Sequence, residues 1–206
     1  MTDASLTTDQ MALKGYKVAL LVDDFFEQAE LEEPLRALQA AGAATFVVSP
    51  KGPMLTGMKH HDKGDLFHVD VPLDHADPSD YDALVLPGGV VNADALRMNE
   101  AAQHFVRAIA RDNKPLAVIC HGAWLLVSAG LVKGRTLTSW PTLKDDLENA
   151  GAKWVDREVQ ADHQWISSRK PDDLPAFNRA FLALLSSHPP LWTTQSSRSE
   201  QPVSNH

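Results

Sequence analysis

Short apolar runs alternate with amphipathic segments along most of the chain. Four of these runs are almost uninterrupted, and they lie at residues 17–22, 44–49, 83–86 and 116–120. Continuous apolar character is typical of strands buried on both faces, whereas a half-exposed strand alternates apolar and polar residues. Apolar residues at helical spacing from Leu31 to Ala41 stop before Gly42, which predicts a helix end there. A second helix is expected from about residue 93 to residue 112.

This order of strand, helix and strand predicts the fold class. Right-handed crossovers between parallel strands place helices on both faces of a sheet, so we expect a doubly wound α/β fold. Alternation over residues 66–71 predicts an edge strand or hairpin beside the core strands. Later elements are expected as a helix at 124–129, a strand at 136–140, a helix at 143–150, strands within 154–168 and a closing helix at 174–185.

The two ends of the chain lack this periodic pattern. Residues 189–206 are rich in Pro, Ser, Thr and Gln, a composition typical of a solvated tail. We therefore expect flexible segments at 1–14 and 189–206 around a single domain at 15–188. A chain of 206 residues with 44% apolar content is long enough to bury one core.

Composition restricts the partners and the compartment. The chain has 27 acidic and 19 basic residues, a formal charge of −8, and no dense basic run, which argues against a nucleic-acid partner. Its single cysteine excludes an internal disulfide, and its polar start does not resemble a signal peptide, so a cytoplasmic location is expected. The apolar runs are much shorter than the roughly 20 residues that span a bilayer, so no membrane segment is expected.

The cysteine lies where a buried strand gives way to a helix. Cys120 ends the run at 116–120, and Gly122 follows two residues later, which is the pattern of a nucleophile elbow. Backbone N–H groups at the start of the next helix favour a thiolate, so we expect Cys120 to be ionised and reactive. The alternative is that Cys120 is a small buried hydrophobic residue, as free cysteines often are.

Two further loops are expected at the same edge of the sheet, because loops after parallel strands gather there. Gly88 and Gly89 follow the third strand, and their backbone N–H groups could approach a substrate oxygen, so we assign them to an oxyanion hole. If the first helix starts near Glu30, Pro34 falls in its first turn and Glu30 lies at the crevice. A carboxyl beside a thiolate tends to hold its proton and donate to sulfur. The alternative is that Glu30 and its acidic neighbours only stabilise the helix N-terminus.

Several motifs follow one another in a fixed order over about residues 16–185. They are Phe26-Glu-Gln-Ala-Glu-Leu31, Asp82-Ala-Leu-Val-Leu-Pro-Gly-Gly89, Ala117-Val-Ile-Cys-His-Gly122, Ser128-Ala-Gly-Leu-Val-Lys-Gly-Arg135, Thr138-Ser-Trp-Pro141, Lys144-Asp-Asp146, Asn149-Ala-Gly151, Trp154-Val-Asp156 and Trp165-Ile-Ser-Ser-Arg169. With these motifs the chain resembles the ThiJ/PfpI family, and within it the PfpI-type intracellular proteases. The resemblance implies the flavodoxin-like scaffold that this family shares with class I glutamine amidotransferases.

The resemblance also implies roles for single residues. The nucleophile of the family corresponds to Cys120, its adjacent histidine to His121 and its crevice glutamate to Glu30. The N–H groups of Gly89 and His121 would bind the oxyanion. In PfpI-type members an acidic residue from a neighbouring subunit orients the histidine, and the matching position is Asp94, with one extra residue after Gly89. This implies a homo-oligomer with its site at an interface, although Asp94 is equally suited to starting a helix.

The resemblance implies a cysteine hydrolase of the stress response. Its substrates would be peptide bonds in damaged proteins or glyoxal-type adducts. The alternative is a redox sensor or chaperone-like protein that uses oxidation of Cys120. Glutaminase relatives use a late His and Glu, and His163 has no acidic residue two positions on, which argues against that role. No cofactor or metal is expected: His60 and His61 should point to opposite sides of an extended chain, and His68 and His75 have no clustered ligands.

Overall fold

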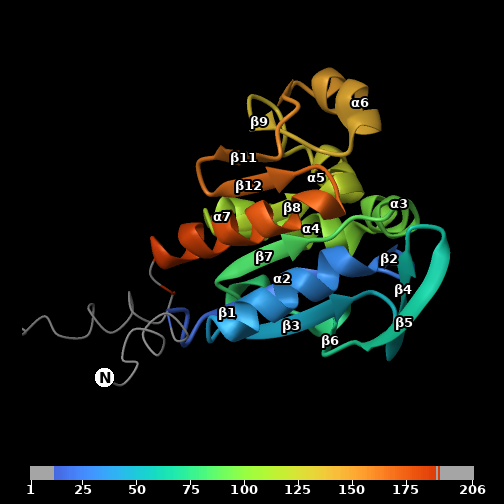
Figure 1. Cartoon of the computed structure of the whole chain (residues 1–206), viewed down its shortest axis with the longest axis vertical. Coiled ribbons are helices and arrows are strands. Elements are labelled where there is room, and N and C mark those ends of the chain that lie inside the picture. The colour runs from blue at the N-terminus through green and yellow to red at the C-terminus, as the bar shows by residue number, and fades with distance from the viewer. Residues whose placement is uncertain (1–11, 189, 191–206) are drawn as a thin grey trace, which may run out of the picture.

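The computed structural model describes residues 12–188 and Pro190, and a seven-stranded sheet forms its centre (Figure 1). The strand order is β11-β12-β8-β7-β1-β3-β6. All neighbours are parallel except β11 and β12. The strands are β1 (Lys17–Leu21), β3 (Ala44–Ser49), β6 (Val71–Pro72), β7 (Ala83–Leu86), β8 (Leu116–Ile119), β11 (Val159–Asp162) and β12 (Trp165–Ser168). The predicted doubly wound, mostly parallel α/β fold is confirmed.

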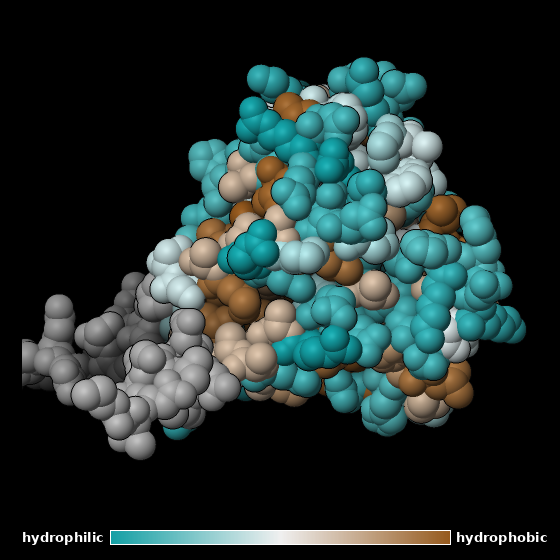
Figure 2. Space-filling view, viewed as in Figure 1, coloured by the Kyte–Doolittle hydropathy of each residue, from teal (hydrophilic) through white to brown (hydrophobic). Residues whose placement is uncertain are grey.

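Helices cover both faces of this sheet. One face carries α2 (Gln28–Ala40) and α7 (Leu174–Ser186), and the other carries α3 (Val90–Met98), α4 (Glu100–Arg111) and α5 (Ala123–Ser128) (Figure 1). Alternate residues of β1 enter the two cores: Val18 and Leu20 pack with α2 and α7, whereas Ala19 and Leu21 pack with α4 and α5. Hydrophilic residues cover most of the visible surface, whereas hydrophobic residues gather over the C-terminal end of α7 and the neighbouring part of α2 (Figure 2).

Two small sheets lie outside the central one. The first joins β9 (Thr136–Leu137) to β10 (Lys153–Trp154), close to α6 (Lys144–Asn149). The second joins β2 (Phe26–Glu27), β4 (Met54–Lys59) and β5 (Asp62–His68), where β4 and β5 form a hairpin beside α2 (Figure 1). The single edge element predicted at 66–71 is therefore two elements, because β5 belongs to the hairpin and β6 to the edge of the central sheet.

Two helix predictions need correction. The segment predicted as one helix at 93–112 is two helices, because the side chain of Asn99 accepts a hydrogen bond from the N–H of Ala102 (3.0 Å) and caps α4. The first helix begins at Gln28 instead of near Glu30, so Pro34 lies inside α2 and not in its first turn. Glu30 nevertheless lies in the first turn, at the edge of the sheet where the site was expected.

The described residues include the predicted domain at 15–188 and the last residues of the predicted N-terminal segment. Residues 1–11, 189 and 191–206, which make up most of the predicted flexible segments, lie outside the described residues. The N-terminal limit at residue 14 is too late, because Leu13 is fully buried and its N–H donates to the carbonyl of Ala41 (2.9 Å). Across the described part of the chain, no helix has the length and apolar character needed to cross a bilayer.

Candidate active site

Cys120 lies at a sharp turn directly after β8, where it is the first residue of the short 3₁₀ helix Cys120–Gly122 that precedes α5. Its φ of 59° lies in the left-handed region that most residues avoid, and the side chain is only 6% exposed. Gly122 allows this turn, because a Cβ there would lie 2.6 Å from the carbonyl oxygen of Leu86 and 2.9 Å from that of Pro87. The structure thus has the strand-to-helix turn that the sequence predicts around Cys120.

Glu30 is the buried acid of the site. It is fully buried, and its Oε2 accepts a hydrogen bond from the N–H of Gly88 (2.8 Å). Its Oε1 has no hydrogen-bond partner among residues 12–188. Because the N–H of Gly88 is already bonded to Glu30, Gly88 does not belong in the predicted oxyanion hole. The N–H groups of Gly89 and His121 point instead to the Cys120 sulfur, where they favour negative charge.

Gly88 lies in close contact with Glu30, Cys120 and the backbone of His121. A Cβ there would lie 2.6 Å from Glu30 Oε2, 2.7 Å from Cys120 Cβ and 2.9 Å from the backbone nitrogen of His121. We predict that Gly88→Ala lowers the free energy of unfolding by about 1–3 kcal/mol, because these neighbours cannot all move aside. Urea unfolding measures this loss. Gly52→Ala is the control, because the φ of Gly52, like that of Gly88, is not positive and its Cβ would meet only the Cβ of Val69, at 4.0 Å; equal losses would contradict the prediction.

Asn92 holds the glycine turn in place, and the sequence analysis did not assign it a role. It is fully buried on α3, and its Nδ2 donates to the carbonyl oxygens of Pro87 (3.1 Å) and Gly88 (2.8 Å). Its Oδ1 accepts from the N–H of Asp23 (2.6 Å), after strand β1. Asn92 therefore ties together the loops after β1 and β7. The position of Asn92, three residues after Gly89, was the only sequence signal that could have indicated this role.

His121 reaches the nucleophile directly. Its Nδ1 lies 3.2 Å from the Sγ of Cys120, so the residue next to the cysteine can act as its base. The ring packs edge-on against Trp124 and is stacked with Trp140, at centroid distances of 5.3 and 5.9 Å. Burial lowers the pKa of His121 to about 4, so the imidazole is neutral near pH 7 and able to accept a proton.

The electrostatics of the Cys120 and Glu30 pair differ from the sequence prediction. Burial raises the pKa of Glu30 to about 8, so Glu30 is mostly protonated at neutral pH, as expected. Burial and the Glu30 carboxylate also raise the pKa of the Cys120 thiol, against the opposing N–H groups of Gly89 and His121. Burial therefore favours the thiol of Cys120 over the predicted thiolate, whereas the N–H groups of the short turn favour ionisation. Ionisation of the thiol needs a base, and His121 is in place.

A cavity of about 270 Å³ opens onto this centre. Cys120, His121, Glu30 and Gly89 all line it. The structure adds six lining residues that the sequence analysis did not place there, namely Glu27, Val90, Trp140, Pro171, and His60 and His61 from the β4–β5 turn. His60 and His61 were predicted to diverge, but they form a tight turn and both reach the cavity.

Asp94 does not line this cavity. It is exposed on α3, on the surface of one chain, and the structure describes a single chain. The same helix exposes three large apolar residues, Val90 (53%), Val91 (55%) and Met98 (78%). The predicted role of Asp94 across a subunit interface therefore stays a prediction. Asp94 lies on a helix that exposes several large apolar side chains.

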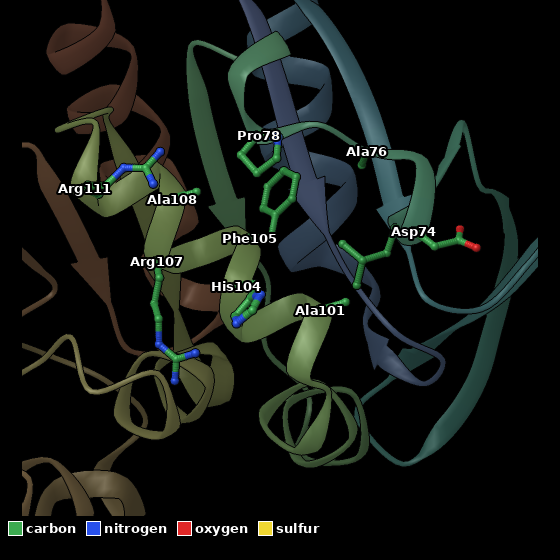
Figure 3. A pocket seen from close by; sticks show the side chains of 10 residues that line it. Asp74, Ala76, Pro78, Ala101, His104, Phe105, Arg107, Ala108 and Arg111 are labelled. Carbon is green, nitrogen blue, oxygen red and sulfur yellow. The ribbon is translucent and has the colours of Figure 1, made fainter.

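A larger cavity of about 670 Å³ lies elsewhere, between α4 and the segment that precedes β7 (Figure 3). Phe105 lies between its walls, and Arg107 and Arg111 extend from α4 at its rim. It contains neither the cysteine nor a buried acid, so we place the active site at the smaller cavity. Among the described residues, no three His, Cys, Asp or Glu side chains are arranged to hold a metal ion.

The fold and the site define a doubly wound α/β protein with a buried cysteine at a strand-to-helix turn, beside a histidine and a buried glutamate. The sequence profile of the DJ-1/PfpI family matches residues 16–184, and the chain belongs to that family. The predicted resemblance is thereby confirmed.

Named relatives are similar over almost their whole length. The deglycase PfpI of Pyrococcus furiosus is 42% identical over 169 residues, 82% of this chain and 99% of that protein. General stress protein 18 of Bacillus subtilis is 40% identical over 173 residues, 83% of this chain and 98% of that protein. Among solved structures, a two-domain protein with DJ-1/ThiJ/PfpI-like and ferritin-like domains from Anabaena variabilis superposes with a TM-score of 0.77 at 30% identity. That match covers 82% of this chain and 48% of the two-domain protein.

Proposed function

We propose that the protein is a cysteine hydrolase of the stress response, acting on glyoxal-type adducts or on peptide bonds of damaged proteins. The observation that carries this proposal is the contact of 3.2 Å between Cys120 Sγ and His121 Nδ1 at the base of an open cavity. Relatives named as deglycases, and one named as a putative cysteine protease, support the same chemistry. A cytoplasmic location belongs to this proposal, since an unpaired reactive cysteine suits a reducing compartment.

The chemistry follows from the contacts. As the sulfur attacks a substrate carbonyl carbon, the thiol proton passes to Nδ1 of His121, and the carbonyl electrons move onto oxygen. The N–H groups of Gly89 and His121 stabilise that oxyanion. Protonated Glu30 donates toward the sulfur and keeps a second negative charge away from it. With a peptide bond as substrate, collapse of the adduct expels the amine with a proton from His121, and water then releases the acyl product from sulfur.

Buried His121 needs an anion to stabilise its positive charge once it takes the proton. No carboxylate of its own chain is paired with it among the described residues. We place this anion on Asp94 of a second copy, with the apolar residues of α3 forming the contact between subunits. The homo-oligomer and the shared site are thus parts of the same proposal.

Mixing two inactive variants tests the shared site. Cys120→Ser and Asp94→Ala should each lose activity, and mixed dimers should regain one complete site, giving about a quarter of wild-type activity in a random equimolar mixture. Subunits are exchanged in mild denaturant, and light scattering reports the solution mass. A mixture no more active than its components, or a monomeric wild type, would contradict the role of Asp94.

Substrate class is tested separately. Peptides with methylglyoxal-modified lysine or arginine and fluorogenic peptides are incubated with wild type, and mass spectrometry follows release of unmodified peptide or cleavage. The proposal expects turnover of at least one class. The redox-sensor alternative rests on the same sulfur, and it would be supported instead by peroxide oxidation of Cys120 without turnover of either substrate class.

A further inference from the structure

The tip of the β4–β5 hairpin lies at the mouth of the catalytic cavity. Lys59 pairs with Asp62 in the antiparallel ladder, so His60 and His61 form the two-residue turn between the strands. On its other side β4 pairs with β2, where Glu27 lies opposite Met58. The hairpin is therefore fixed to the segment that leads directly into α2, and this places His60 beside the site.

Glu27 holds His60 in a defined position. The backbone N–H of His60 donates to Glu27 Oε2 (3.2 Å), and the His60 Nδ1 lies 3.8 Å from the same oxygen. The Glu27 side chain is only 14% exposed, whereas that of His60 is 76% exposed. Glu27 is itself anchored, because its backbone N–H donates to the carbonyl of Gly88 (3.2 Å). The pair thus connects the hairpin tip to the glycine turn after β7, which lies against Cys120.

His60 adopts a backbone conformation that few residues other than glycine adopt. Its φ of 59° lies in the left-handed region, where a glycine would fit without strain. Strained positions of this kind cluster at functional sites, because the side chain that is kept there has a use. An imidazole next to a carboxylate, at the solvent-facing mouth of a cavity, is the arrangement of a general base.

We propose that His60 is the general base that activates the hydrolytic water in the second half of the reaction, and that Glu27 is its positioning residue. This inference rests on the proposed hydrolase function and adds a proton acceptor to it. Water attacks the carbonyl carbon of the Cys120 thioester, and its proton passes to the His60 imidazole. The C–S bond then breaks, the proton held on His60 passes through water to the sulfur and restores both the thiol and the neutral imidazole, and the carboxylic product leaves.

His121 is poorly suited to this second task. Its Nδ1 faces the sulfur, and burial lowers its pKa to about 4, which makes the ring a weak base for water. His60 faces solvent, and the charged groups around it are Glu27, Asp172 and Lys59, with Glu32 and Glu33 of α2 lining the same surface pocket. The two histidines of this cavity therefore have different roles: His121 accepts the proton of the thiol, and His60 accepts the proton of the water.

The test separates acylation from hydrolysis of the acyl group. Cys120 is acetylated with p-nitrophenyl acetate, samples are quenched in acid, and intact mass follows gain and loss of the acetyl group. His60→Gly removes the imidazole and suits the left-handed turn, so the fold is kept. We expect acetylation at the wild-type rate and loss of the acetyl group slowed at least about tenfold. Added imidazole should restore part of the rate, which a structural defect would not allow.

Two controls complete the test. Glu27→Gln should slow deacetylation to a smaller extent, because the His60 ring remains but is less well oriented. His68→Gln, at the far end of β5 and outside the cavity, should behave as wild type. Unchanged deacetylation in His60→Gly overturns the role of His60 alone. Absence of acetyl transfer to Cys120 in the wild type overturns the hydrolase proposal and this inference together.

Discussion

Replacing Cys120 by serine is expected to lower kcat/KM toward the preferred substrate at least about 1000-fold, or about 4 kcal/mol of transition-state stabilisation. The hydroxyl is a far weaker nucleophile than the thiol, and His121 with a pKa of about 4 is too weak a base to activate it. Stability should change little, because serine is nearly isosteric with cysteine. Turnover of a methylglyoxal-modified peptide and the midpoint of thermal unfolding measure the two effects.

A matched control is available far from the site. His75→Gln lies in an exposed 3₁₀ helix, where the His75 side chain is 75% exposed. It should keep wild-type activity in the same preparation. If Cys120→Ser retained a tenth or more of the activity, a nucleophile other than the cysteine would have to be found.

Replacing Glu30 by glutamine should change the pH dependence of both stability and activity. Glu30 has a folded-state pKa of about 8 against 4.5 when exposed, so between these values the folded state keeps a proton that the unfolded state has lost. Wild-type stability therefore falls relative to Glu30→Gln as pH rises from about 4.5 to about 8. The accumulated difference should be roughly 3–5 kcal/mol. Urea unfolding of both proteins across this range measures it.

The same titration predicts the activity profile. A glutamine can accept the Gly88 N–H and donate toward sulfur, as protonated Glu30 does, so Glu30→Gln should keep part of the activity. Wild type should lose activity above about pH 8 as Glu30 loses its proton, and the variant should not. Glu32→Gln, on the exposed side of α2, is the control that should follow wild type. Parallel profiles for Glu30→Gln and wild type would contradict a proton-bearing Glu30.

The central sheet could be predicted from the sequence because each core strand is buried on both faces and therefore reads as a continuous apolar run. The limits of the helices were harder to predict from the sequence. The cap at Asn99 splits what looks like one apolar periodicity, and only the structure shows its side chain bonded to the N–H of Ala102. Similarly, Pro34 suggested a helix start near Glu30, whereas the structure accommodates it inside α2.

Cys120, Glu30 and His121 were predictable because each follows a strand end, and strand ends of a parallel sheet meet. His60 was not, since its place depends on a two-residue turn in a hairpin that pairs with β2. The raised pKa of the Cys120 thiol could not be predicted from the sequence either, because it depends on how deeply the sulfur and the Glu30 carboxyl are buried together.

Both the proposed hydrolysis and the role of His60 require that Cys120 forms a covalent bond to the substrate. Mixing wild type with a ¹³C-labelled methylglyoxal-modified peptide, quenching in acid within one turnover and mapping the adduct by mass spectrometry tests this directly. We expect a labelled adduct on Cys120 that forms before product appears and decays as product accumulates. Product formation with Cys120 unmodified throughout would contradict the account.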